Sequence, residues 1–433
     1  MSSTALLDGF ERLESVARTE PAWISDARRA AWTWLQHTGL PTERDEAWRY
    51  TPLNDLVGRV YEPASAVGHC VDAAMVEELA GDHGGPLMVF VNGLFASELS
   101  DVRGDETGLH LDNIASLPDG SDPIVATPTH SLRADGFAAL NQAIGSDGAV
   151  VVVDPDTCLV APIHVVHLSM PGDEPTASQP LTLVHVGEAS RLTLIETFCG
   201  RPGSSLINAV TRIDVGPGAV VDHYTVQAQA PGATHLGRTD ISQSADSEVR
   251  SCSVMLGADV ARQCVDIVLC GADARTRVEG LYLPKGAQHH DIVTTIEHAA
   301  SGGTSRQMFK GVVDDAARGS FSGRVIVRPD TVKTDASQES RSLLLAPRAQ
   351  ADSRPWLEIF ADDVKCTHGA TVGRLDDEAL FYLRSRGIAS SEASAMLIGA
   401  FAAEITDAIG PATLRDRVAA VVTDDLAARM RTR

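Results

Sequence analysis

The feature that most constrains the fold is a regular spacing of short apolar segments in the middle of the chain. They are rich in Val, Ile, Leu and Thr and are separated by Gly, Asp and Pro. The segments begin near Arg191, Ser205, Ala219, Thr234, Ser247, Val260, Ala274, His289, Thr304 and Arg318, at steps of 13 to 15 residues. Short alternating segments predict β-strands. A near-constant step is typical of a solenoid, in which each repeat buries its apolar face against its neighbours.

The spacing narrows the fold class to a mainly β protein. Helical patterns nearly vanish after residue 149, which argues against a doubly wound α/β fold with helical crossovers. A propeller blade needs about 40 residues and usually carries a recurrent signature, which is missing. We therefore expect a parallel β-helix, with a β-sandwich as the alternative.

Helical patterns flank this β region. At the N-terminal side, residues 5–18 and 22–38 have apolar positions at helical spacing, and a polar, aromatic connector at 41–53 leads to a strand-like run at 86–95. At the C-terminal side we expect helices over 375–388, 391–409 and 412–430, the last two divided by Gly410 and Pro411.

These patterns predict a division into three parts. Residues 1–85 form an N-terminal helical region and connector, residues 86–372 form the β-helix core with its leading strands, and residues 373–433 form a C-terminal helical domain.

Charge and hydropathy exclude several classes of partner. The chain carries 36 basic and 58 acidic residues, a net charge of −22, which disfavours nucleic acids and anionic lipid surfaces. It has no apolar run long enough to span a membrane, and its first residues, MSSTALLDGFERLE, carry charges where a signal peptide needs an apolar core. The 7 cysteines include no CxxC pair. We expect a cytoplasmic protein with reduced thiols.

Motifs for common catalytic chemistry are missing. No GxxxxGK[ST] loop is present, so the chain is not expected to hydrolyse ATP. The sequence GSFSG at 319–323 has Phe321 where a nucleophile elbow needs serine. We expect a protein that is not an enzyme.

Two segments gather residue types that bind metals. QHHDIVTTIEH at 288–298 places His290 and His298 about 27 Å apart on an extended strand, too far for one ion, so we expect its polar side chains to form hydrogen bonds along a stacked sheet. In ADDVKCTHGATVG at 361–373, Cys366 and His368 share one face of a strand about 6.7 Å apart. A thiolate and an imidazole suit iron or zinc, but two ligands do not complete a site. Other segments or another chain would have to complete it, and a lone cysteine is also often a buried small hydrophobe.

A longer pattern resembles a known family. The run LEIFADDVKCTHGATVGRLDDEALFYLRSRGI at 357–388 is similar to the C-terminal signature of the SufB/SufD family of iron–sulfur cluster assembly proteins, and more closely to its SufD members. QHHDIVTTIEHAASGGTSRQMFKGVVDDAARGSFSGRVIV at 288–327 resembles the family's β-helix core. PTERDEAWRYTPL at 41–53 and FVNGLFASELS at 90–100 resemble the SufD N-terminal half.

The resemblance implies a right-handed parallel β-helix flanked by helical domains, in a complex with a SufB-like subunit and a SufC-like ABC ATPase. The ATPase would dock on the C-terminal helical region, 375–409. Aromatic and arginine side chains commonly dominate interfaces, which favours as contacts Leu380, Phe381, Leu383, Arg384 and Arg386. The alternative is that the apolar members of this set are core residues of a helical bundle.

For the site, the resemblance implies a junction with the SufB-like subunit near residues 320–370. A transient iron–sulfur cluster would form there, with His368 facing a cysteine of the partner and Cys366 nearby. No cofactor is expected to stay bound to the isolated chain. SufB's own cysteine and glutamate align with Ala349 and Gly369, so we expect a non-catalytic SufD-like subunit and not a SufB-type scaffold.

Two other functions remain open at this stage. A β-helical enzyme acting on acidic polysaccharide would need a secretion signal and a basic groove. The other is a homodimer of the isolated chain with a structural role.

Overall fold

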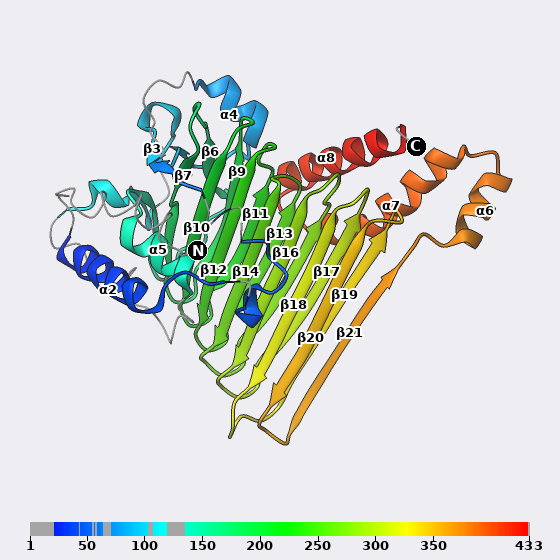
Figure 1. Ribbon diagram of the computed structural model, residues 1–433. Helices are drawn as coiled ribbons and strands as arrows, with labels where there is room; N and C mark the ends of the chain where they lie inside the picture. Colours follow the sequence, from blue (N-terminus) through cyan, green and yellow to red (C-terminus); the bar gives the residue numbers. More distant parts are fainter. Residues whose placement is uncertain are drawn as a thin grey trace.

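The computed structural model describes residues 21–42, 44–53, 56, 59–63, 71–102, 107–118 and 135–431. The helix expected over 5–18 lies outside these residues. In the described part of the chain, a parallel β-solenoid runs through the centre and helices lie at both ends (Figure 1).

Two long sheets form the walls of the solenoid. Sheet A contains β5 (Gly148–Val153), β8 (Leu181–Val186), β10 (Ser205–Val215), β12 (Ala233–Gln243), β14 (Val260–Leu269), β16 (His289–His298), β18 (Arg318–Val327) and β20 (Gln350–Ile359). Sheet B contains β2 (Leu87–Val91), β6 (Ile163–Ser169), β9 (Arg191–Gly200), β11 (Val220–Gln227), β13 (Glu248–Met255), β15 (Arg275–Tyr282), β17 (Thr304–Val313), β19 (Thr334–Leu344) and β21 (Val364–Gly373).

Consecutive strands from β5 onward, apart from the short β7, alternate between the two sheets, so one coil contains two strands. Each long strand pairs in parallel with the strand of the next coil, as Val220 pairs with Glu248 and Glu248 with Arg275. The step of about 14 residues in the sequence is therefore half a coil. The predicted starts of the ten repeats agree with those of β9 to β18 to within one residue, and the parallel β-helix is confirmed.

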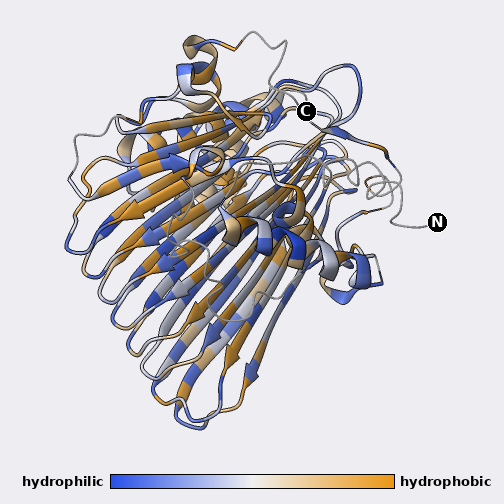
Figure 2. Cartoon of the chain, turned by 90° about the vertical axis from the view of Figure 1, so that its left-hand side faces the viewer, coloured by the Kyte–Doolittle hydropathy of each residue, from blue (hydrophilic) through white to orange (hydrophobic). Residues whose placement is uncertain are grey.

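Alternation along each strand builds the core. Figure 2 shows bands of hydrophobic and hydrophilic residues along the strands. Inward-facing residues from both sheets, such as Val265, Val278 and Ile292, form the largest apolar cluster and are almost fully buried. Burial of this apolar surface is the main stabilising contribution to a solenoid.

The C-terminal helices are α6 (Asp377–Ser385), α7 (Ser390–Thr406) and α8 (Ala412–Arg431), close to the predicted ranges. Helices α7 and α8 cover the outer face of sheet B, whereas α6 contacts α7 and has no buried residue. Asp376 caps α6, because its carboxylate accepts hydrogen bonds from the backbone N–H groups of Glu378 and Ala379. Ile398 of α7 and Val418 of α8 pack with Leu281 of β15 in one apolar cluster.

The N-terminal segments pack on the opposite side and at the first coils. They comprise α2 (Ala22–Thr38), the short helix η1 (Glu46–Trp48), β1 (Glu62–Pro63), α4 (Ala73–Ala80), β3 (Leu94–Phe95), η2 (Ser97–Leu99), β4 (Leu109–Asn113), η3 (Ile114–Ser116), α5 (Gly136–Ile144) and β7 (Thr176–Ser178). The connector at 41–53 does join the N-terminal region to the core: the guanidinium of Arg262 lies 4.1 Å from the ring of Trp48, and the hydroxyl of Thr51 donates a 2.6 Å hydrogen bond to Asp291. The sequence patterns did not predict α4 or α5.

The two ends of the solenoid differ. At the first coils, the sheets end in β3 and β4, short antiparallel strands that pair with β2 and β5. At the other end, β20 and β21 are the last strands of sheets A and B, and each pairs with a strand on one side only (Figure 1). Ile359, Phe360 and Val372 at this end are exposed by 39%, 61% and 45%.

Candidate open-end site

His368 and Cys366 lie on β21, at the unpaired edge of sheet B. Register places Cys366 beside Ala336 and His368 beside Gln338 of β19. Cys366 packs in a small apolar cluster with Val325, Val327 and Ala336, which fixes its side chain on the inner face of the sheet. Because side chains alternate along a strand, His368 lies on the same face as Cys366, as the sequence predicted.

The two side chains differ in exposure and chemistry. His368 is exposed, whereas Cys366 is partly buried, and burial raises the pKa of its thiol above the usual value. A thiol must lose its proton before it binds iron. A neutral imidazole already has a free lone pair near neutral pH. This arrangement favours His368 over Cys366 as a ligand.

An aromatic pair in the interior near His368 is replaced by serines in the last coil. Phe309 and Phe321 stack with ring centroids 4.7 Å apart, and in the next coil their register partners are Ser340 and Ser353. Beside them, the side chain of Gln338 is only 2% exposed. The polar rung, defined as Gln338, Ser340 and Ser353, therefore lies between the aromatic pair and the open end.

A groove crosses the outer face of sheet B and reaches the same edge. Its volume is about 540 Å³, and its lining residues are Arg277, Glu279, Arg306, Gln307, Met308, Ser337, Gln338, Glu339, Thr367, His368 and Gly369. A side chain added at Gly369 would meet no heavy atom within 4 Å. Position 369 therefore borders open space.

Helix α6 exposes the residues predicted to bind an ATPase. None of its residues is buried, Phe381 is exposed by 74% and Tyr382 by 57%. The guanidinium of Arg386 lies 5.1 Å from the ring of Tyr382. Phe381 is thus not a core residue, whereas Leu380 and Leu383 are partly buried and Arg384 is exposed. Tyr382 was not among the predicted contacts, although it neighbours Phe381.

An ion-pair cluster joins the C-terminal helices to the last coils. Lys310 of β17 is only 2% exposed, and its ammonium donates to the carboxylate of Glu404 and to the backbone oxygen of Phe401, 2.9 Å away. Arg341 of β19 lies 3.7 Å from Glu404 and also pairs with Glu339 in the groove. The sequence offered no sign of this buried lysine.

The segment at 288–298 forms hydrogen bonds, as expected. The carboxylate of Asp291 accepts hydrogen bonds from Thr51, Arg262 and Ser320. His298 contacts the Ser305 hydroxyl at 2.9 Å. Within the described ranges, no three His, Cys, Asp or Glu side chains are placed to hold one metal ion.

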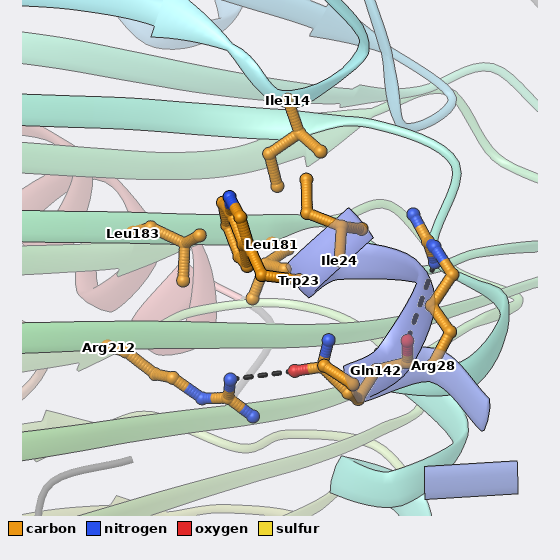
Figure 3. A pocket seen from close by; sticks show the side chains of 9 residues that line it. Trp23, Ile24, Arg28, Ile114, Gln142, Leu181, Leu183 and Arg212 are labelled. Atoms are coloured by element: carbon orange, nitrogen blue, oxygen red, sulfur yellow. Dashed lines mark hydrogen bonds between the residues drawn. The ribbon is translucent and has the colours of Figure 1, made fainter. Parts of the chain in front are cut away.

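A second hollow lies under α2 (Figure 3). Trp23, Ile24, Leu181 and Leu183 supply its apolar wall, and Arg212 donates a 2.7 Å hydrogen bond to the side chain of Gln142. Its volume of about 20 Å³ is close to that of one water molecule. It is therefore a small packing gap between α2 and sheet A, too small for a ligand.

Comparisons with known proteins agree with this architecture. Residues 168–401 match the family described as SUF system FeS cluster assembly, SufBD core domain. The chain is 32% identical over 392 residues to the iron–sulfur cluster assembly protein SufD of Escherichia coli, covering 89% of each chain. It is 32% identical over 424 residues to an iron–sulfur cluster assembly SufBD family protein of Synechocystis, covering 95% of this chain and 93% of the relative.

A third relative is the iron–sulfur cluster assembly protein SufD of Bacillus subtilis, which is 26% identical over 434 residues and covers 93% of this chain and 94% of its own length. The chain belongs to the SufB/SufD family, as its sequence signature predicted. Among the described helices, none is both long and apolar enough to cross a membrane.

Proposed function

We propose that this chain is a non-catalytic, SufD-like subunit of the cytoplasmic SUF complex for iron–sulfur cluster assembly. The observation that carries the proposal is the open end of the solenoid. The last strands of both sheets, β20 and β21, are unpaired on one side, and β21 carries His368. Unpaired strand edges bind further strands, so this end fits the β-structure of a SufB-like subunit.

The nascent cluster is the cargo of the complex and forms at this junction. The imidazole of His368 binds iron there, beside a cysteine supplied by the partner. Cys366 has a secondary role, because its thiol is partly buried and its pKa is raised. The isolated chain holds no cluster stably, since the part of the chain that the structure describes brings no three His, Cys, Asp or Glu side chains together for one metal ion.

Helix α6 is the docking element for a SufC-like ABC ATPase. The exposed rings of Phe381 and Tyr382 and the adjacent Arg386 match the residue types that dominate protein interfaces. The missing P-loop in this chain is consistent with ATP hydrolysis by a partner. Family membership favours this assembly role over a polysaccharide-acting enzyme, and Ala349 and Gly369 favour it over a SufB-type scaffold.

The test is co-expression with SufB-like and SufC-like chains, followed by purification and analysis of iron and acid-labile sulfide. We expect the wild-type chain to co-purify with both. His368→Ala should leave the complex intact and lower the cluster yield at least several-fold, and Cys366→Ser should lower it less. A His368→Ala complex that matures clusters at the wild-type rate would refute the ligand role. A chain that binds neither partner would refute the proposal as a whole.

A further inference from the structure

The polar rung takes the place of an aromatic pair in the last coil of the interior. Phe309 and Phe321 are fully buried and in ring contact, whereas their partners one coil further on are serines. Two hydroxymethyl groups fill far less space than two phenyl rings. The last coil thus replaces a tightly packed apolar pair by small polar groups next to the open end.

The polar atoms of this rung have no partner among the described residues. The hydroxyl oxygens of Ser340 and Ser353, and both the nitrogen and the oxygen of the Gln338 amide, are buried without a hydrogen bond. Ser340 is only 1% exposed. A buried polar group without a partner costs about 1–3 kcal/mol, so several in one place indicate that a hydrogen-bonding group belongs there.

The amide of Gln338 occupies space that the absence of a side chain at Gly323 leaves open. A Cβ at Gly323 of β18 would lie 2.0 Å from the amide nitrogen of Gln338. Any other residue at 323 would displace the amide. In the ladder, Gln338 is the direct neighbour of His368, so its amide lies at the base of the proposed iron ligand.

The chemistry of the rung selects an anion. By alternation, the inner faces of β19, β20 and β21 carry no carboxylate, and their ionisable groups are Cys366 and His368. Neutral O–H and N–H donors stabilise an anion here, and no carboxylate on these inner faces repels it. Hydrogen bonds to the sulfur atoms are a regular feature of iron–sulfur sites.

We propose that Gln338, Ser340 and Ser353 form a hydrogen-bond-donating site for a sulfur anion, either free hydrosulfide or a sulfide of the nascent cluster, beside His368. This inference rests on the proposed function for the identity of the cargo. It assigns the sulfur side of the site to the interior of this chain, whereas His368 serves the iron side.

The first arm of the test uses the isolated full-length chain and sodium hydrosulfide under anaerobic conditions. If free hydrosulfide is the ligand, we expect saturable binding by calorimetry. Ser340→Leu and Gln338→Met should weaken it at least about tenfold, as expected for lost hydrogen bonds to a charged acceptor. Ser340→Thr keeps the hydroxyl and should restore binding. Ser337→Ala, on the outer face of the same strand, is the matched control.

The second arm uses the reconstituted complex. If the ligand is a cluster sulfide, the isolated chain does not bind hydrosulfide, but Ser340→Leu lowers the cluster yield several-fold in complexes that form normally. The melting temperature should not fall in this variant, because an apolar side chain fills the rung and removes an unpaired hydroxyl. A merely structural role would instead lower both the melting temperature and complex formation.

The proposal is overturned if Ser340→Leu changes neither hydrosulfide binding nor cluster yield, which would mean that the rung holds only water. Should that variant fail to fold, Ser353→Ala combined with Gln338→Met decides the same question. If the wild-type chain forms no complex, the proposed function fails, and the hydrosulfide titration still decides whether the sulfur site exists.

Discussion

Substituting His167 should make the protein more resistant to acid. The imidazole of His167 stacks inside the solenoid between Phe198, at 4.7 Å, and Phe90, at 5.3 Å. Both of its ring nitrogens are buried without a hydrogen-bond partner among the described residues. Burial lowers the pKa of His167 from 6.5 to about 4, against a smaller opposing effect of the Glu196 carboxylate.

The expected magnitude follows from the difference in proton uptake. As the pH falls below 6.5, the unfolded chain protonates His167 while the folded chain does not do so until about pH 4. The wild-type protein therefore loses about 1.4 kcal/mol of unfolding free energy per pH unit in this window, or about 2 kcal/mol by pH 5. His167→Phe removes this loss, so its free energy of unfolding relative to wild type should rise by about 2 kcal/mol between pH 7.5 and pH 5.

The measurement is urea unfolding of both proteins at the two pH values, followed by circular dichroism. Fitting the larger phenylalanine ring into the core costs about 1–3 kcal/mol of stability. This cost is the same at both pH values, so it cancels when the two are compared. The same two measurements on a variant with the exposed His37 replaced by glutamine provide the control for removing a histidine elsewhere in the chain. An equal effect of His167→Phe at both pH values would show that the folded protein protonates this imidazole as readily as the unfolded chain.

Three other predictions concern the helices and the isolated chain. Glu404→Ala should destabilise the protein by about 1–3 kcal/mol, because it leaves the buried ammonium of Lys310 without its carboxylate. Lys310→Met should cost less, because methionine has a similar shape and carries no charge. Chemical denaturation of both variants compares their free energies of unfolding. Phe381→Ala with Tyr382→Ala should reduce retention of the ATPase in a pull-down at least about tenfold without changing the melting temperature, since both rings are exposed, and full retention would remove α6 as the docking element. The purified isolated chain should neither hydrolyse ATP nor retain a cluster after desalting, and turnover that persists after removal of contaminating ATPases would contradict this.

The sequence predicted the solenoid because strand length and turn residues repeat, and both are local properties. Turn residues such as Asp246 and Asp273 have positive φ angles of 58° and 59° and recur at the boundaries that set the step. The spacing of about 14 residues between strand starts does not determine how many strands make one coil, because that number depends on how successive strands bend and pack. Helix α5 was not predicted because it is only nine residues long and mostly apolar, so its sequence pattern differs little from that of a buried strand.

The candidate site was only partly predictable. The spacing of Cys366 and His368 gave their shared face, because alternation along a strand is a local rule. The polar rung depends on which residues stack across coils, and the sequence reveals it only when Phe309 is aligned with Ser340 and Phe321 with Ser353. The pairing of Lys310 with Glu404 joins residues 94 positions apart and needs the packing of α7 on sheet B.

The difference between the two ends of the solenoid limits how far association can go. A chain with two free sheet ends could stack head to tail without limit and grow into a fibre. In the described part of the chain, the edge strands at the first coils are β3 and β4, of 2 and 5 residues, whereas β20 and β21 have 10 residues each. A short edge strand offers few backbone groups for pairing, so growth from the first coils is disfavoured. Two solenoids joined through β20 and β21, whether the partner is a related subunit or another copy of this chain, therefore present only these short edges at their far ends.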